Sequence, residues 1–585
     1  MNPLVVASRP GHPLAAAVAD GIVEPRHVAG AAVLMDLAFG RSAAGRSADE
    51  WLLVALALQS PEGEHSCLDL GDMARHAPEH ASSAVAGTLS RGEAHWSGVA
   101  RGLIGLVGTP DEAGTSLLIL DGPRLYLARL FADECFVAGD LVARSGAGRE
   151  LSVLMGGPGS GKTTLTAARL IERLSTAPAG FSIALAAPTG KAALRMRSVL
   201  IQKVEQQARS ATGVGAAGLE RAMAVLAASE STTVHRLLGV SSSGSRSRYR
   251  FDHERRLPHD LVILDECSML SLELLTSLLR AVRDDAGLWI VGDADQLASV
   301  GAGTVLSDIR EAARRPGSPL AKVEELDQMH RFSDAQVRAL VAAVRDAGGK
   351  SGSSLDRQVE AFFDVLGAAS GALTWIEPDA NRKKVEDVLG AAVGRAHAIA
   401  VAASGEAAEE ELAAWLAQRD NDVQLLCVHR AGRLGVAGIN QRIRSALGAR
   451  AVEHWYPGRP VMVTRNDRRT NLFNGDTGTV VRRPDGSKVV VLSEPIGREP
   501  VPVARIEHHE LAYAMTVHKS QGSEFGQVVA IMPTEPSGLC TREMLYTAIS
   551  RTRDRLTVVA SRDVLEHMLR TPISRATGLA DRFGA

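Results

Sequence analysis

A glycine-rich segment near residue 151 has the residue types and spacing that bind phosphate. Residues 151–164 read LSVLMGGPGSGKTT, in which an apolar run of strand length ends at glycines. Gly156, Gly161, Lys162 and Thr163 fall on the spacing G-x-x-x-x-G-K-[ST]. Glycines allow the backbone to wrap a phosphate with its N–H groups inward. The lysine would then reach the β- and γ-phosphates, and the threonine hydroxyl would hold Mg²⁺.

The residues after this loop have a helical period, so the loop leads into a helix N-terminus, where partial positive charge favours a phosphate. A glycine-rich turn without a ligand is the alternative interpretation. The strand before the loop and the helix after it are, however, the context that a nucleotide site requires. The sequence therefore predicts that ATP and Mg²⁺ bind at Gly156, Gly157, Pro158, Gly159, Ser160, Gly161, Lys162, Thr163 and Thr164.

A carboxylate pair follows a second apolar run of strand length. Residues 261–264 read LVIL and run directly into Asp265 and Glu266. A carboxylate at the carboxyl end of a parallel strand, in the same sheet as a phosphate-binding loop, can hold Mg²⁺ through water. Thr163 and Asp265 are therefore the predicted metal residues, and Glu266 is the predicted general base for the attacking water.

Three further segments carry residues that could contact the nucleotide. In GDADQL, which follows a short apolar strand, Asp293 and Gln296 could sense the γ-phosphate, although a surface turn is the alternative for Gln296. Arg331, in EELDQMHRF, is a candidate cation for the same phosphate. RLYLARLF, upstream of the loop, could form one wall of an adenine pocket with Tyr126 or Arg129.

Length and composition restrict the class of protein. A chain of 585 residues has room for about three or four domains, and its net charge of −2 limits any nucleic-acid contact to a local basic surface. The five cysteines lie far apart without C-x-x-C spacing, which argues against a zinc ribbon and a disulfide scaffold. We find neither a signal sequence nor an apolar run of membrane-spanning length, so we expect a cytoplasmic protein with no membrane contact.

The patterns along the chain predict three domains. Residues 1–115 carry amphipathic helical patterns without catalytic spacing, typical of a small helical domain for docking or support. Residues 116–346 form the predicted second domain, in which strand and helix patterns alternate from 151 to about 330 and favour a parallel sheet. The polar, basic insert at about 240–260 is either a surface loop or a hairpin beside a nucleic-acid strand. Residues 347–585 contain a second strand set, in which 452–511 has the turn spacing of a small β-barrel.

In this order the segments resemble the motifs of superfamily 1 helicases. GGPGSGKTT is similar to motif I, APTGKAA to motif Ia, DECSM to motif II and GDADQL to motif III. AMTVHKSQGSEF and LYTAISRT are similar to motifs V and VI. Cys267 stands where a small residue is usual in motif II. The resemblance covers about residues 115–562.

Among those helicases the chain is similar to the RecD family, the alpha subunits of exodeoxyribonuclease V. The segments that carry this similarity are TVHRLL before a short insert, LLCVHRAGRLGVAGINQRI and TRNDRRTNLFNGDTG. The short N-terminal region also resembles RecD more than the stand-alone RecD-like helicases, which carry a much larger N-terminal extension.

The resemblance implies an α/β fold with two RecA-like P-loop domains built on parallel sheets. It also implies a small helical N-terminal domain and a small SH3-like β-barrel insert in the second RecA-like domain. The implied activity is an ATP-dependent 5′→3′ DNA helicase. It would be the motor of a RecBCD-type helicase-nuclease that processes double-strand DNA ends for recombinational repair. The implied partners are RecB-like and RecC-like subunits in a heterotrimer, duplex DNA ends and a single strand in the motor channel.

Family position also implies roles for individual residues. The implied catalytic residues are Lys162, Asp265, Glu266, Gln296, Arg331 and Arg551, the last reaching the γ-phosphate from the second half. The implied DNA contacts are Thr189, His235, Asn466, Thr516, His518 and Lys519. Two alternatives stay open: a stand-alone helicase of the same superfamily, and an ATP-gated scaffold that binds DNA without translocation. Intact Lys162 and Glu266 argue against the scaffold, because a protein that does not hydrolyse ATP has no need of them.

Overall fold

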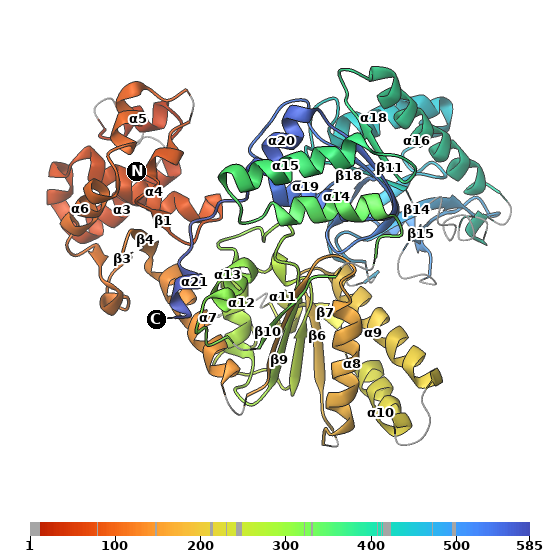
Figure 1. Ribbon diagram of the computed structural model, residues 1–585, viewed down its shortest axis with the longest axis horizontal. Coiled ribbons are helices and arrows are strands. Elements are labelled where there is room, and N and C mark those ends of the chain that lie inside the picture. Colours follow the sequence, from red (N-terminus) through yellow and green to blue (C-terminus); the bar gives the residue numbers. More distant parts are fainter. Residues whose placement is uncertain are drawn as a thin grey trace.

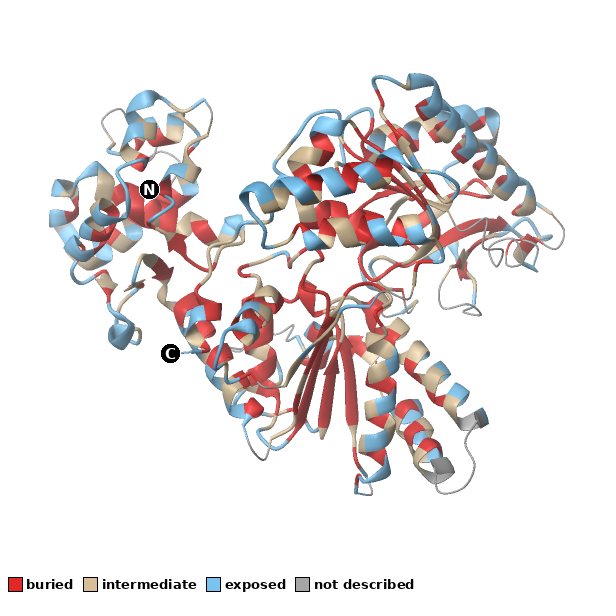
Figure 2. Cartoon of the chain, in the orientation of Figure 1, coloured by how far each residue is buried: buried red, intermediate tan, exposed pale blue. Residues whose placement is uncertain are grey.

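The computed structural model describes residues 12–584 except 79, 147–148, 179, 211–214, 230, 241–248, 321, 329–330, 406–407, 411, 413–422, 468, 471 and 494–498. Part of the basic insert predicted at about 240–260 therefore lies outside the described residues. Two parallel sheets with helices on their faces dominate the structure (Figure 1). The inner strands of both sheets are largely buried, while the outward sides of the surrounding helices are exposed (Figure 2).

Six parallel strands form the first sheet, in the spatial order β10-β5-β9-β8-β6-β7. They are β5 (Leu151–Gly156), β6 (Ile183–Ala187), β7 (Ser231–Thr233), β8 (Leu261–Leu264), β9 (Gly287–Gly292) and β10 (Val323–Leu326). All four residues of β8 are buried, as expected for a parallel strand that is covered on both faces. The apolar run LVIL therefore reflects burial on two sides.

Helices cover both faces of this sheet. They are α7 (Ala128–Ser145), α8 (Lys162–Ser175), α9 (Gly190–Ser210), α10 (Gly215–Ala228), α11 (Val234–Leu237), α12 (Leu272–Ala281) and α13 (Val305–Arg314). Val262 and Leu264 pack in one core with α7, α12 and α13, whereas Leu261 and Ile263 pack in another with α8, α9 and α10. The alternation follows from the two-residue period of a strand.

Five parallel strands form the second sheet, in the order β11-β20-β19-β12-β18. They are β11 (Leu373–Ile376), β12 (Val423–Cys427), β18 (Ala514–Thr516), β19 (Phe525–Ile531) and β20 (Thr552–Val559). One core joins this sheet to α14 (Ala335–Asp346), α15 (Gly352–Gly367), α19 (Arg542–Ile549) and α20 (Arg562–Arg570). A second core joins it to α16 (Arg382–Ala402) and α18 (Val436–Leu447). The prediction of an α/β fold with parallel sheets is confirmed.

An antiparallel sheet occupies the segment predicted to be a barrel, between α18 and β18. Its strands are β13 (Pro460–Val463), β14 (Thr477–Arg482), β15 (Lys488–Leu492), β16 (Val501–Pro502) and β17 (His509–Leu511). They lie in the order β16-β15-β14-β13-β17 and enclose a small apolar core. The description of this segment as an SH3-like barrel stays a prediction.

The N-terminal region combines helices with a small sheet. The helices are α2 (Ala15–Ala19), α3 (Pro25–Phe39), α4 (Ala48–Gln59), α5 (Ser83–Leu89) and α6 (Glu93–Gly102). The sheet, in the order β1-β4-β3-β2, contains β1 (Leu68–Asp69), β2 (Val107–Gly108), β3 (Leu118–Asp121) and β4 (Arg124–Leu127). Strands of two to four residues are too short to show alternation in a sequence. Because β2 pairs with β3, this sheet spans the domain boundary predicted at residue 115, and the domain limits stay a prediction.

The C-terminal tail returns from the second sheet to the first. After α20 it runs past the N-terminal region and ends in α21 (Leu579–Arg582), which packs against α7 and α13 (Figure 1). Leu579 and Phe583 are buried in the core on that face of the first sheet. Among the described helices, none has both the length and the apolar character needed to cross a bilayer.

Candidate functional site

The glycine-rich loop runs from the end of β5 at Gly156 to the start of α8 at Lys162. Gly159 and Gly161 have φ angles of 68° and 91°, in the left-handed region that suits glycine. A Cβ atom on Gly159 would also lie 2.1 Å from the Cβ of Arg331, so a side chain at this position would collide. The spacing of the glycines in the sequence therefore corresponds to a tight backbone turn, which packs against Arg331.

Lys162 points back into this loop. Its ammonium group donates to the carbonyl oxygens of Gly156 and Gly157, the second at a distance of 3.0 Å. Burial lowers the pKa of Lys162, while the carboxyl groups of Asp293 and Glu266 act in the opposite direction. The lysine thus lies between the phosphate-binding loop and the carboxylates that follow β8 and β9.

A cavity of about 870 Å³ opens in front of the loop. The predicted residues that line it are Pro158, Gly159, Ser160, Gly161, Lys162, Thr163, Thr164, Asp265, Glu266, Asp293, Gln296, Arg331 and Arg551. Gly522 and Glu524 lie between β18 and β19, and Arg551 follows α19, so the cavity lies between the two parallel-sheet halves. Tertiary structure thereby brings together residues that are almost 400 positions apart.

Two buried polar atoms at this cavity lack a partner within the described chain: a hydroxyl that can donate to an anionic ligand, and an amide oxygen that can only accept, for example from water. The hydroxyl of Ser160 and the carbonyl Oε1 of Gln296 are buried without a hydrogen-bond partner among the described residues. Buried polar atoms normally have partners, and both residues line the cavity. The hydroxyl of Thr163 and the carboxylate of Asp265 supply hard oxygen donors at the same cavity, which suit Mg²⁺.

The carboxylates sit in strained and buried surroundings. Glu266 has a φ of 53°, one of two positive φ angles among the described non-glycine residues, and such strain clusters at functional sites. Its backbone N–H donates to Oδ1 of Asp265 at 2.8 Å. Burial, followed by the charge of Glu266, raises the pKa of Asp265 to about 6. A bound cation would favour the ionised form of Asp265.

Asp293 connects the two halves. Its Oδ2 accepts hydrogen bonds from Nε2 of Gln296 at 2.9 Å and from the hydroxyl of Tyr546, on α19, at 3.2 Å. The next turn adds another bridge, because the N–H of Leu297 donates to Oγ1 of Thr547 at 3.0 Å. The segment that could sense the γ-phosphate is therefore held by the second half.

Sequence reasoning missed an acidic partner of the arginines. Glu524 forms ion pairs with Arg331 and with Arg195 on α9, and Arg195 also donates to the carbonyl of Gly522 at 3.0 Å. Burial alone would raise the pKa of Glu524, but Arg195 and Arg331 lower it to about 2. Glu524 lay inside the segment AMTVHKSQGSEF, which we had singled out, whereas Arg195 carried no signal beyond its place in a helix.

Arg551 reaches the cavity from the end of α19. Its side chain is 2% exposed, and it donates through Nε to the carbonyl of Thr547 at 3.2 Å and through Nη1 to that of Ser523 at 3.4 Å. These backbone bonds fix the guanidinium in place. Unlike Arg331, it has no carboxylate partner among the ion pairs of the described residues.

The predicted adenine wall is wrong for this cavity. Tyr126 and Arg129 do not line it, because Tyr126 lies on β4 of the N-terminal sheet and Arg129 on α7, which packs on a face of the first sheet, while the loop opens at the carboxyl ends of the strands. Tyr126 is buried against Phe131, with ring centroids 5.5 Å apart, and Arg129 pairs with Glu273.

Three predicted DNA contacts border two further cavities. Thr189 and His235 line one of about 680 Å³, and His518 lines another of about 260 Å³. Both cavities are also lined by Val300, whose side chain is 85% exposed. Val300 is four residues beyond Gln296, so this surface lies close in sequence to the nucleotide cavity.

The other three predicted DNA contacts, Thr516, Lys519 and Asn466, differ from one another in exposure and in bonding partners. Thr516 is buried, and its hydroxyl accepts from the N–H of Lys519 at 3.4 Å. The ammonium of Lys519 pairs with Glu510. Asn466 is exposed on a loop of the antiparallel sheet. The same loop region places Phe473 against Gly190, since a Cβ there would lie 2.4 Å from the Phe473 ring.

The fold and the cavity define an ATPase of the helicase class: two parallel sheets, a phosphate-binding loop with an acidic pair on one, and a buried arginine on the other. Family models agree, since one described as an AAA domain matches residues 141–302 and one described as a UvrD-like helicase C-terminal domain matches residues 511–559. The chain belongs to the RecD family of ATP-dependent DNA helicases.

Curated relatives carry that family assignment. "RecBCD enzyme subunit RecD" of Mycolicibacterium smegmatis is 35% identical over 573 residues, which cover 91% of this chain and 93% of that protein. The protein of the same name from Mycobacterium tuberculosis is 34% identical, with coverage of 91% on both sides. "ATP-dependent RecD2 DNA helicase" of Deinococcus radiodurans is 32% identical and covers 75% of this chain but 51% of that protein.

Solved structures align less closely. A Pif1 helicase from Bacteroides, in complex with ADP-AlF3 and single-stranded DNA, is 17% identical to this chain. The alignment covers 76% of this chain and 94% of that one, with a TM-score of 0.38.

Proposed function

We propose that this chain is the 5′→3′ DNA motor of a RecBCD-type helicase-nuclease that processes double-strand ends for recombinational repair. The proposal is supported by RecD relatives that align along nine-tenths of both chains. The single observation that carries it is that Lys162 and Arg551, from different halves, line one cavity. A nucleotide held there would contact both halves, so binding and hydrolysis can change how the halves are oriented.

In this proposal the first half binds and activates ATP. The loop 156–164 cradles the phosphates, Lys162 neutralises the β- and γ-phosphates, and Thr163 and Asp265 hold Mg²⁺. When bound, Mg²⁺ neutralises charge that develops on the phosphate oxygens. Glu266 accepts a proton from the attacking water, and Gln296 reports the γ-phosphate to the segment that follows it.

Arg331 and Arg551 complete the site. Among the described residues, Arg331 pairs with Glu524, whereas the partners of Arg551 are backbone carbonyls. We propose that Arg551 contacts the γ-phosphate and that Arg331 assists it. An arginine that meets the transferred phosphate from the opposite half couples hydrolysis to closure of the cavity.

DNA would cross both halves on the side of Val300. Thr189, His235, Asn466, Thr516, His518 and Lys519 are the proposed contacts, and they are supported by family position. Contacts with the DNA backbone would make binding largely independent of sequence and sensitive to salt.

The proposed domains are 1–115, 116–346 and 347–585, with an SH3-like module at about 452–511. The N-terminal domain would dock on a RecC-like subunit, beside a RecB-like subunit in a heterotrimer. The names of the relatives, which describe subunits of a RecBCD enzyme, support a complex of this kind.

The test compares wild type with Lys162→Gln, and with Lys350→Gln as a matched surface control. We expect DNA-stimulated ATP hydrolysis in wild type and in the control, and its loss in Lys162→Gln. Absence of DNA-stimulated hydrolysis in wild type would favour the scaffold alternative. Co-purification with RecB-like and RecC-like subunits distinguishes the complex from the stand-alone helicase: processive unwinding by the isolated chain supports the latter.

A further inference from the structure

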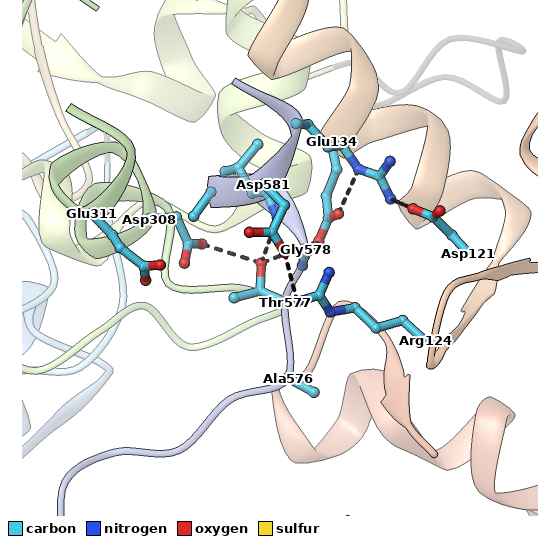
Figure 3. A network of polar contacts seen from close by, with 12 residues as sticks. Asp121, Arg124, Glu134, Asp308, Glu311, Ala576, Thr577, Gly578 and Asp581 are labelled. Atoms are coloured by element: carbon cyan, nitrogen blue, oxygen red, sulfur yellow. Dashed lines mark hydrogen bonds and ion pairs between the residues drawn. The ribbon is translucent and has the colours of Figure 1, made fainter. Parts of the chain in front are cut away.

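The C-terminal tail makes polar contacts with the N-terminal region and the first half (Figure 3). Downstream, Thr577 donates to Asp308 on α13 and to the buried Glu134 on α7, both at 3.2 Å, and the N–H of Gly578 donates to Glu134 at 3.1 Å. These contacts anchor the tail. Arg575 lies two residues before Thr577 in the tail, and its side chain is 6% exposed.

Arg575 joins three parts of the chain through one guanidinium. Its Nη1 donates to the carbonyl oxygens of Gly301 and Gly303, at 3.2 and 2.9 Å. Its Nη2 forms an ion pair with Glu64 of the N-terminal region. A guanidinium has a rigid planar set of donors, which allows it to hold two carbonyls and a carboxylate at once.

Glu64 holds the same loop a second time. Its carbonyl oxygen accepts from the N–H of Gly303 at 2.9 Å. Its φ of 66° makes it, with Glu266, one of two non-glycine residues with a positive φ in the described chain. Neighbouring backbone adds support, because the N–H of Ala576 donates to Nδ1 of His65 at 2.8 Å. The N-terminal region and the tail therefore both bind the loop that contains Gly301 and Gly303.

This loop comprises residues 297–303 and begins directly after Gln296. At its start, Leu297 is bonded to the second half through Thr547, and its carbonyl accepts from Nε2 of Gln521 at 3.2 Å. In its middle, Val300 is exposed between the two cavities that the proposed DNA contacts line. The loop therefore extends from the nucleotide cavity to the proposed DNA surface, with Arg575 fixing its far end.

We infer that Arg575 is a positioning residue that sets the 297–303 loop, so that DNA contact at the loop is transmitted to Gln296. Because the same guanidinium is paired with Glu64, the conformation of the N-terminal region influences how strongly DNA stimulates ATP hydrolysis. This inference rests on the proposed motor function. The alternative is that Arg575 only fastens the tail to the rest of the protein.

The experiment compares full-length wild type, Arg575→Gln and Arg582→Gln. Arg582 is the matched control, since it fastens the same tail through Glu134 at 2.9 Å and Asp121 at 3.1 Å, and its ion pairs within the described part of the chain do not involve the loop. For Arg575→Gln we expect DNA-stimulated kcat to fall about tenfold, the effect of one lost charged hydrogen bond, with the DNA-free rate unchanged. For Arg582→Gln we expect a lower melting temperature with DNA stimulation preserved.

Two more variants sharpen the result. Glu64→Gln should reduce DNA stimulation, and in combination with Arg575→Gln it should add little, because both variants break one unit. Arg575→Lys keeps the charge but loses the planar set of donors, so it should give partial stimulation and also covers the case in which Arg575→Gln fails to fold.

Three outcomes would overturn the inference. The first is unchanged DNA stimulation in Arg575→Gln or Arg575→Lys. The second is an equal loss in Arg582→Gln, which would leave only the fastening role. The third is absence of DNA stimulation in wild type, which would overturn the proposed function as well and is thereby distinguished from the other two.

Discussion

Replacement of Arg551 by glutamine tests the central chemical claim. The residue lies 2% exposed at the end of α19, in the same cavity as Lys162. If its guanidinium approaches the γ-phosphate in the transition state, one unit of charge compensation is lost on substitution. Glutamine is two bonds shorter, but its amide nitrogen corresponds in position to the arginine Nε and can retain the bond to the carbonyl of Thr547, so the change removes the charged end of the side chain.

The magnitude follows from Coulomb's law. Two unit charges about 4 Å apart interact by about 4 kcal/mol at an effective dielectric constant of about 20. Each 1.36 kcal/mol changes a rate about tenfold, so kcat should fall about a thousandfold. This agrees with the range of about 10³–10⁵ for arginines that act on a transferred phosphate. The KM for ATP should change little, because the 156–164 loop still holds the nucleotide.

The assay is steady-state ATP hydrolysis at saturating single-stranded DNA, with melting temperatures as a folding check. Arg555→Gln serves as the control, since Arg555 is an exposed arginine on the adjoining strand β20. Arg551→Lys should recover only part of the rate, because an ammonium cannot replace the planar donors. A folded Arg551→Gln protein whose kcat stays within about tenfold of wild type would refute the reasoning.

Three further predictions concern stability and DNA affinity. Glu524→Gln should lower the melting temperature at pH 7. The folded-state pKa of this carboxyl is depressed to about 2, so its stabilisation is present above its ordinary pKa of 4.5; the gap to wild type should narrow as the pH falls toward 2. Asp308→Asn should raise the melting temperature at pH 8 more than at pH 5. Burial, followed by the charge of Glu134, raises the pKa of Asp308 to about 7. The wild-type protein therefore loses stability as the pH rises through that value, whereas the asparagine variant has no such group to ionise. Equal differences in melting temperature between variant and wild type at both pH values would contradict this. Lys519→Ala should weaken DNA binding and its salt dependence, whereas Glu510→Gln, which frees the lysine, should strengthen binding in fluorescence anisotropy titrations.

The sequence by itself specified the local chemistry of the first half. The loop from Gly156 to Thr164 and the carboxylates after LVIL could be predicted because strand, turn and helix N-terminus are adjacent in the chain. Backbone geometry then leaves few choices: Gly159 and Gly161 adopt φ angles that suit glycine. The antiparallel strands within 452–511 were indicated in the same way, by turn spacing.

Contacts between distant segments had no such signal. Nothing near Arg195 or Glu524 indicates that they pair. The adenine wall assigned to Tyr126 was wrong because proximity in sequence to the loop does not specify to which sheet a strand belongs, and Tyr126 lies on β4 of the N-terminal sheet. The contact between Arg575 and Glu64 joins two residues that are 511 positions apart in the sequence. Such pairs are decided by how complete elements pack.

The sequence thus determined which residues can bind a triphosphate, because that capacity resides in a short stretch of backbone with fixed dihedral preferences. Only the tertiary structure decided that Arg551 faces the same cavity, that Glu524 lies between two arginines, and that the 297–303 loop is held from both ends of the chain. The physical reason is that burial and charge pairing depend on positions in space, which a local pattern of residue types does not encode.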